Sequence, residues 1–208
     1  MPGSKYASVV LLILAGVAKC QQTGASYTDP VTGFTFWRYI NGDYTFGITF
    51  PEDVTTDFIG QFSVTATAGW AGASLGGTMQ NSLLLVTYPN GDSITTSLRQ
   101  ADEYANPHLI NGTDAAIHSI ASGTYVNETT YTITFLCTDC ILTDGRTFYS
   151  NATQPVLGWA QSTDAIADPS STNSTLNFHE KGYGNWYFNV EDAKSPDFDS
   201  WASQASAA

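Results

Sequence analysis

The sequence predicts an all-β fold, an antiparallel β-sandwich, from three observations. Aromatic residues are frequent, with 5 Trp, 11 Tyr and 11 Phe among 208 residues, and these residue types favour strands. Short runs of alternating apolar and polar residues recur between turn residues. No stretch of eleven or more residues keeps a helical period, so we expect helices to be short and peripheral.

The expected strands follow one another at the spacing that is typical of a sandwich. They are Gly33–Trp37, Tyr44–Phe50, Asp57–Thr67, Leu83–Tyr88, Ser93–Leu98, Thr130–Cys137, Val156–Gln161 and Trp186–Val190. The segment Pro89-Asn90-Gly91-Asp92 predicts a hairpin turn between the fourth and the fifth of these strands. His118 lies in a further alternating segment, where we interpret it as an ordinary solvent-facing strand residue.

Residues 1–20 have the layout of a secretory signal peptide. Lys5 precedes an apolar run at residues 9–15, and small residues follow that run. The run is too short to span a bilayer. We place the cleavage after Cys20, with Ala18 as the alternative, and we expect the mature protein to be secreted and extracellular.

The remainder of the chain divides into one folded domain, residues 21–195, and a terminal segment, residues 196–208. The terminal segment is polar and then rich in Ser and Ala. We therefore expect a loose tail or the first residues of a linker.

Seven Lys and Arg residues against nineteen Asp and Glu residues give a formal net charge of -12. An acidic surface repels polyphosphates and anionic lipids. We therefore expect neither a nucleic acid nor a membrane as a partner.

Four N-glycosylation sequons lie in the second half of the chain, at Asn111, Asn127, Asn151 and Asn173. Each is an acceptor in an exported protein. We expect the segments around them to face solvent.

Cys137 and Cys140 form a C-x-x-C motif, for which three chemistries compete with a structural disulfide. Covalent attachment of a c-type haem needs a histidine after the second cysteine, where this chain has Ile141. A redox-active pair would open a helix, whereas this motif follows a strand and runs into a turn. Zinc would need a second pair of ligands at metal spacing. We favour a short structural disulfide that clamps a strand end.

Met79 is the only methionine after removal of the signal peptide, and it lies close to the glycine pair Gly76-Gly77. It can be a single buried gap-filler, but the glycines also let a broad, flat group approach the backbone. His108 and His118 are poor candidates for a site. His179 lies in a glycine-punctuated loop rich in aromatic residues, where an ordinary surface histidine is the alternative interpretation.

A thioether and a neutral imidazole are the pair that a six-coordinate haem iron binds on its two faces. Such an iron has no open position for oxygen or substrate, so it transfers electrons rather than atoms. We therefore interpret Met79 and His179 as a candidate pair of haem ligands.

Six segments, spread from residue 28 to residue 179, form a pattern that is known from one family. They are residues 28–36 (TDPVTGFTF), 57–60 (DFIG), 75–86 (LGGTMQNSLLLV), 137–140 (CTDC), 155–160 (PVLGWA) and 178–179 (FH). In this order they resemble the N-terminal cytochrome domain of fungal cellobiose dehydrogenases. The resemblance covers the chain from about Tyr27 to Asp192.

The resemblance implies an antiparallel β-sandwich of immunoglobulin-like topology, related to the DOMON domains, which holds a non-covalent haem b. It implies that Met79 and His179 are the axial ligands. It also puts Tyr104 and Arg99 near positions that approach the haem propionates, for which a phenol and a guanidinium are suitable donors.

The pair Cys137 and Cys140 falls at the disulfide of the family. Two departures accompany the resemblance. Tyr88 stands where the family has a larger indole, and Glu180-Lys181 differs from the family after the histidine.

The function that the resemblance implies is the relay of single electrons. The expected donor is a flavin dehydrogenase domain, and the expected acceptor is a secreted copper polysaccharide monooxygenase. The 208 residues contain no G-x-G-x-x-G motif that opens a βαβ unit, so we do not expect these residues alone to oxidise a sugar.

Two rival functions stay open at this point. A haem-free sandwich could bind carbohydrate by stacking its aromatic side chains on sugar rings. A secreted glycoside hydrolase would need two opposed carboxylates roughly 5 to 9.5 Å apart, and none of the five glutamates has a neighbour at alternating strand spacing. A copper monooxygenase is excluded because it needs a histidine at the mature N-terminus, where Gln21 or Lys19 would stand.

Overall fold

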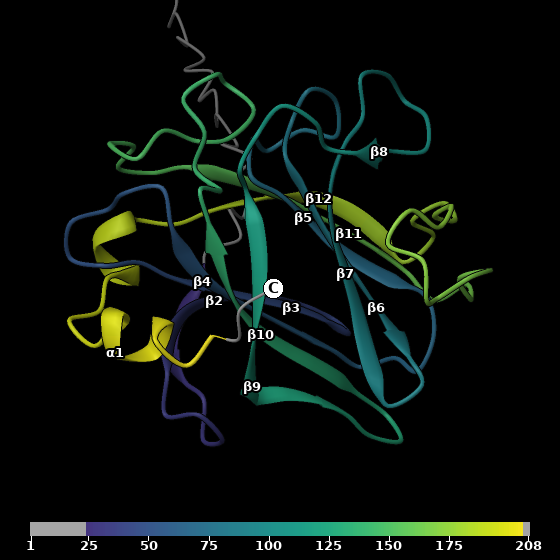
Figure 1. Ribbon diagram of the computed structural model, residues 1–208, viewed down its shortest axis with the longest axis horizontal. Coiled ribbons are helices and arrows are strands. Elements are labelled where there is room, and N and C mark those ends of the chain that lie inside the picture. Colours follow the sequence, from purple (N-terminus) through teal and green to yellow (C-terminus); the bar gives the residue numbers. More distant parts are fainter. Residues whose placement is uncertain (1–23, 206–208) are drawn as a thin grey trace, which may run out of the picture.

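The computed structural model describes residues 24–205, which form two antiparallel six-stranded sheets packed as a sandwich (Figure 1). The fold class expected from the sequence is therefore confirmed. The expected signal peptide lies outside the described residues.

The first sheet has the strand order β1-β2-β3-β4-β10-β9. Its strands are β1 (Ala25–Thr28), β2 (Thr35–Asn41), β3 (Tyr44–Thr49), β4 (Phe58–Val64), β10 (Tyr131–Thr138) and β9 (Ala116–Val126).

The second sheet has the strand order β12-β11-β5-β6-β7-β8. Its strands are β12 (Gly182–Tyr187), β11 (Val156–Ser162), β5 (Trp70–Ser74), β6 (Leu84–Asn90), β7 (Ser93–Gln100) and β8 (His108–Leu109). Because β5 pairs with β11, two segments almost ninety residues apart in the chain lie side by side.

Aromatic side chains fill the space between the sheets. Phe62 and Phe135 stack with their ring centroids 6.1 Å apart, and Tyr44 lies 5.5 Å from Trp159. The Tyr44 hydroxyl in β3 donates to the carbonyl of Gly72 in β5 at 3.1 Å, so this buried polar group is paired across the interface. Burial raises the pKa of Tyr44, which keeps the donor protonated. These contacts fix β5 against the first sheet.

Most of the expected strands coincide with observed strands to within a few residues. The last one is displaced, because β12 begins at Gly182 and residues 190–193 form the 3-10 helix η1 (Val190–Ala193). The expected hairpin turn is confirmed, since Asn90 pairs with Ser93 and Gly91 has φ 61°.

The sequence did not predict β1, β5 and β8, and it indicated only part of β9. In β5 the run Trp-Ala-Gly-Ala-Ser lacks the branched residues that favour strands, although all five residues are buried.

His118 lies on β9 as expected. Its side chain is half-buried rather than fully exposed, with Nε2 3.0 Å from the Thr138 hydroxyl.

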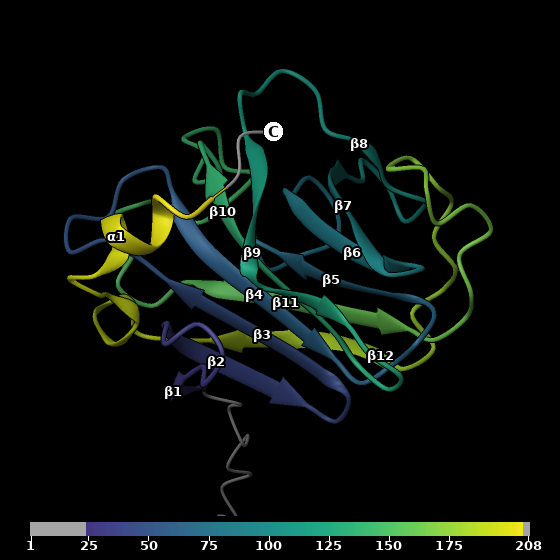
Figure 2. The same cartoon turned by 60° about the horizontal axis from the view of Figure 1, so that its bottom comes forward.

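The described part of the terminal segment packs on the domain, unlike the loose tail expected from its composition. The helix α1 (Phe198–Ala202) buries Phe198 against the outer side of the first sheet, and Trp201 stacks on Phe34 with centroids 4.8 Å apart. In Figures 1 and 2, α1 lies on the opposite side of the molecule from the yellow-green loops that follow β11. The two aromatic residues explain why this segment packs.

Helices are short and peripheral, as the sequence predicts. Within residues 24–205, neither η1 nor α1 has the length and the apolar character that crossing a bilayer would require.

Candidate functional site

A cavity of about 700 Å³ lies on the outer face of the second sheet. Its floor comes from alternate residues of β5 and β11, whose intervening residues face the core. These floor residues are Gly72, Ser74, Gly158 and Ala160. Because none carries more than one heavy atom beyond Cβ, the floor leaves room for a broad, flat group against the backbone.

Three loops form the walls of the cavity. They contribute residues 77–79, residues 104–107 and residues 176–179. Met79 reaches the cavity from the loop between β5 and β6, and His179 reaches it from the loop before β12. The fold thus brings the two predicted ligand residues, a hundred positions apart in the chain, to one cavity.

The turn that carries Met79 depends on a glycine. Gly77 has φ 77°, and a Cβ there would lie 3.0 Å from the carbonyl oxygen of Val156. The Ser74 hydroxyl donates to the carbonyl of Thr78 at 2.5 Å, which ties this turn to the end of β5. The sequence suggested that a flat group could approach the backbone at the glycine pair. In the structure, the close neighbour of Gly77 is Val156 of β11.

The His179 ring packs among three aromatic side chains. Its centroid lies 4.3 Å from that of Phe178, 4.6 Å from that of Tyr183 and 6.4 Å from that of Trp70. The Nδ1 atom of His179 is buried and has no hydrogen-bond partner in the described part of the chain. Buried polar atoms are normally paired, so Nδ1 is an exception among the described residues, and because it is shielded from the cavity it is not the atom that would contact a group bound there.

Glu180 follows His179 and binds the loop after β11. Its Oε1 accepts hydrogen bonds from the backbone N–H and the hydroxyl of Thr163, at 2.7 and 2.8 Å. Desolvation raises the pKa of Glu180, but hydrogen bonds from Ser162 and Thr163 outweigh it and lower the pKa to about 2. The side chain is therefore an anionic acceptor at neutral pH.

The lining of the cavity contains no Asp, Glu, Lys or Arg residue. The larger outward side chains of the lining are mostly apolar, among them Trp70, Leu84, Val86 and Leu176. The paired carboxylates of a glycoside hydrolase are thus missing from this cavity.

The two expected propionate donors lie in different environments. Tyr104 lines the cavity, and its side chain is 83% exposed. Arg99 is fully buried on β7 and is not part of the lining. Burial lowers the pKa of Arg99, while the neighbouring Tyr88 raises it.

All five N–H donors of Arg99 bind groups of the protein. They donate to the Ser97 hydroxyl, to the Tyr88 hydroxyl and to the carbonyls of Pro107, Thr172 and Ser174. No donor remains for a carboxylate of a ligand. We therefore assign Arg99 to the support of the loops at residues 107 and 172–174.

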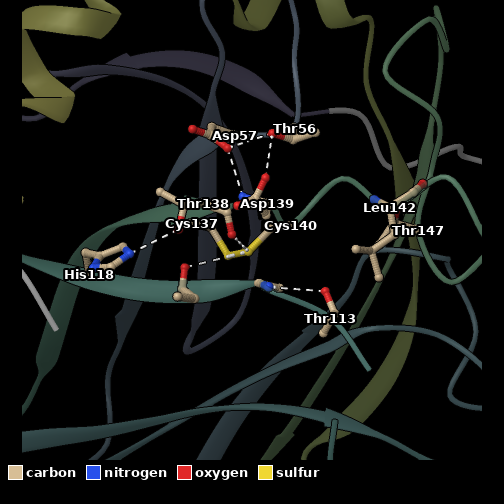
Figure 3. Close-up of a disulfide and its surroundings, with 12 residues drawn as sticks. Thr56, Asp57, Thr113, His118, Cys137, Thr138, Asp139, Cys140, Leu142 and Thr147 are labelled. Atoms are coloured by element: carbon tan, nitrogen blue, oxygen red, sulfur yellow. Dashed lines mark hydrogen bonds between the residues drawn. A yellow bond between two sulfur atoms is a disulfide. The ribbon is translucent and has the colours of Figure 1, made fainter. Parts of the chain in front are cut away.

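Cys137 and Cys140 form a disulfide at the end of β10, as the sequence predicts. Figure 3 shows the polar contacts around it, in which Asp57 accepts from the N–H of Asp139 at 2.8 Å and Thr56 donates to the Asp139 carboxylate at 3.2 Å. Neither cysteine lines the cavity. The disulfide thus closes the turn after β10, and the hydrogen bonds to Thr56 and Asp57 fasten this turn to the segment before β4.

The remaining candidate residues lie away from the cavity. The four sequon asparagines, Asn111, Asn127, Asn151 and Asn173, are all exposed. His108 is exposed and lies 3.2 Å from the Asp102 carboxylate.

Sequence reasoning missed the floor and Trp70. A usable signal was present in the run Trp70–Ser74, in which glycine and serine alternate with alanine. After Trp70, such a run leaves only Gly72 and Ser74 on the outward face, which is unusual for a buried strand.

The comparisons with known proteins agree with this geometry. The family described as "Cytochrome domain of cellobiose dehydrogenase" matches residues 27–200. The solved cytochrome domain of Myriococcum thermophilum cellobiose dehydrogenase is 33% identical, covers 90% of this chain and 98% of that one, and superposes with a TM-score of 0.80. The cytochrome b domain of pyranose dehydrogenase from Coprinopsis cinerea is 30% identical, covers 89% and 97%, and has a TM-score of 0.78.

A longer relative shows the same similarity. A pyrroloquinoline quinone-dependent pyranose dehydrogenase from Coprinopsis cinerea is 33% identical over 201 residues, or 92% of this chain. The chain spans only 27% of that relative's length. The resemblance inferred from the sequence is confirmed: the chain belongs to the family of cytochrome domains of cellobiose dehydrogenase, which implies electron transfer.

Proposed function

We propose that the cavity binds one non-covalent haem b, with Met79 and His179 as the axial ligands, and that the domain relays single electrons. The observation that carries the proposal is that a thioether and an imidazole, from separate loops, line the same cavity.

The residues of the cavity fit such a group in size, shape and chemistry. A volume of about 700 Å³ lies within the roughly 300 to 1,000 Å³ of ligand pockets. The floor of small residues suits a flat ring system, and the uncharged lining suits an apolar one. The His179 ring lies at the edge of this cavity, where it can serve as a ligand.

Met79 and His179 would hold the haem iron, which would then supply one-electron redox chemistry and have no open position for substrate. The chain's own residues then have limited tasks. Trp70, Leu84 and Val86 exclude water from the cavity, and the turn at Gly77 presents the thioether. Tyr104, at the exposed side of the lining, is the proposed donor to a propionate.

The partners of the domain are part of the same proposal. The donor is a dehydrogenase domain, either the flavin type expected from the sequence or a quinone type, which is supported by the name of the Coprinopsis cinerea relative. The acceptor is a secreted copper polysaccharide monooxygenase. An extracellular address is supported by the disulfide, since disulfides persist in oxidising compartments.

Carbohydrate binding without haem is the second candidate. It is favoured by exposed aromatic rings at the cavity, since Phe178 is 72% exposed and Tyr183 is 69% exposed. Under this alternative the purified protein is colourless and binds cellulose or a soluble oligosaccharide.

The test is the absorption spectrum of the secreted protein, oxidised and then reduced with dithionite. We expect one haem per chain and a low-spin, six-coordinate spectrum in both states. Met79→Leu and His179→Gln should each lose the six-coordinate spectrum. The exposed His108→Gln is the matched control and should keep it. A colourless wild type, or variants with unchanged spectra, would contradict the proposal.

A further inference from the structure

The loop that carries His179 is fastened at several points. Asn106 donates to the carbonyl of Leu176 at 2.7 Å, and Trp70 donates from its indole to the carbonyl of Asn177 at 3.0 Å. The Asn177 amide donates to the carbonyls of Asp164 and Ala165, at 3.1 and 3.0 Å. These contacts hold the chain before His179.

On the other side of His179, the Lys181 N–H donates to the carbonyl of Gln161 at 3.2 Å. The Glu180 side chain makes the connection to Thr163. The two hydrogen bonds from Thr163 meet on a single oxygen of Glu180. Glu180 is the next residue in the chain, so its Cα lies one peptide unit, about 3.8 Å, from that of His179. A shift of Glu180 therefore moves the imidazole with it.

The contacts form a closed circuit that runs from His179 through Glu180, Thr163 and Trp70 back to His179. Thr163 directly follows Ser162, which pairs with Trp70 across β11 and β5. The Trp70 ring in turn packs edge-on against the His179 ring. The imidazole is thus held to the sheet from two directions, through the Trp70 ring and through the Glu180 carboxylate.

The backbone segments that join Trp70 and Thr163 to the sheet are tightly packed. A Cβ on Gly69 would lie 2.0 Å from the carbonyl oxygen of Ser162 and 2.5 Å from the Cα of Thr163, so no side chain fits between the residue before β5 and the end of β11. Thr163 is therefore packed directly against this backbone, which suits it to anchor a loop.

We propose that Glu180 is a positioning residue, which fixes the His179 imidazole at the cavity by fastening its loop to Thr163. The inference rests on the proposed function, because it assumes that His179 is a haem ligand. It predicts that loss of the acceptor loosens the ligand, whereas loss of the negative charge alone does not.

The test compares haem-loaded variants by the rate at which ferric haem passes to an excess of apomyoglobin, followed by the change in the absorption spectrum. Glu180→Ala removes the acceptor, and it should raise this rate by about three- to tenfold, as expected for the net loss of a typical hydrogen bond at an exposed carboxylate. Glu180→Gln keeps an Oε1 acceptor, so its rate should stay within about twofold of wild type. Lys181→Ala, an exposed neighbour in the same loop, is the matched control and should match wild type.

Thr163→Val tests the same contact from the other side. It removes the hydroxyl donor but keeps the backbone donor, so the rate should lie between wild type and Glu180→Ala. The double variant Thr163→Val/Glu180→Ala should be no faster than Glu180→Ala alone, because the two residues act through one interaction. If Glu180→Ala folds poorly, Thr163→Val alone still tests the contact, because it leaves Glu180 in place.

Two results would overturn the inference. One is an equal change in Glu180→Gln and Glu180→Ala, which would indicate an effect of charge. The other is a wild-type rate in Glu180→Ala. A wild-type protein without haem would instead refute the proposed function, so the two failures are distinguishable.

Discussion

At the scale of single residues, the two proposed ligands are held in different ways. Met79 lies in a turn whose backbone is fixed by Gly77 and by the Ser74 hydroxyl. His179 lies among aromatic rings and is flanked by hydrogen-bonded neighbours. The thioether therefore depends on backbone conformation, and the imidazole depends on side-chain contacts.

Gly77→Ala tests the first of these dependences. A non-glycine residue at φ 77° costs about 1–2 kcal/mol, and the contact with the carbonyl of Val156 adds to this. We expect urea unfolding to show a loss of stability and the absorption spectrum to show weakened thioether ligation. Gly91→Ala is the matched control, because φ is 61° and no atom lies within 4 Å of the added Cβ. It should lose stability only, and an altered spectrum there would contradict this account.

Arg99→Gln tests whether Arg99 supports the loops at residues 107 and 172–174 or binds a haem propionate. Several buried carbonyls lose their donor, so we expect a loss of about 2–4 kcal/mol in the free energy of unfolding. The loss should be equal with and without haem, as measured by urea unfolding of both forms. A loss confined to the haem-loaded form would restore Arg99 as a propionate donor.

At the scale of elements, the cavity lies over the part of β5 and β11 where the outward residues are small. Ala160 lies opposite Gly72, and Gly158 lies opposite Ser74. Two paired rows of small residues give a level floor, and the loops above it contribute the side chains that contact a ligand.

Ala160→Phe tests the floor. The added ring would project into the cavity, so we expect haem binding to fall by at least tenfold in a titration followed by absorbance. The haem-free protein should remain folded by circular dichroism, because the change lies on the outer face. Ala160→Ser is the control and should bind normally. Normal haem binding by Ala160→Phe would mean that the floor does not contact the ligand.

The sequence predicts some of these elements better than others. Strands rich in branched and aromatic residues, such as β3 and β10, are evident from alternation, whereas β5 consists mainly of alanine and glycine and gives no such signal. Met79 and His179 were found by their scarcity and their neighbours. Their meeting at one cavity depends on the pairing of β5 with β11, a long-range contact that no local pattern encodes. For Arg99, residue type alone was misleading: a guanidinium is a suitable donor to a propionate, but all of its N–H groups donate to other groups of the protein.

At the scale of the whole molecule, the stabilising features are separate from the cavity. The disulfide and the contacts around Asp139 lie at the end of β10 (Figure 3). The helix α1 packs on the outer side of the first sheet, and the cavity lies on the outer face of the second. Stability and ligand binding should therefore respond to different substitutions.

Replacing both cysteines tests this separation. Cys137→Ser/Cys140→Ser opens a short loop, for which chain entropy predicts a loss of about 2 kcal/mol. We expect a lower midpoint of urea unfolding and an unchanged absorption spectrum of the haem-loaded protein. A changed spectrum at a temperature where the variant is folded would show that the disulfide does affect the site.

The most direct test of the central claim is a crystal structure of the haem-loaded protein, with anomalous diffraction measured at the iron edge. This account predicts one iron peak per chain, between the Met79 sulfur and the His179 ring and within bonding distance of both. An iron peak elsewhere, or a peak with either side chain turned away from it, would contradict the account.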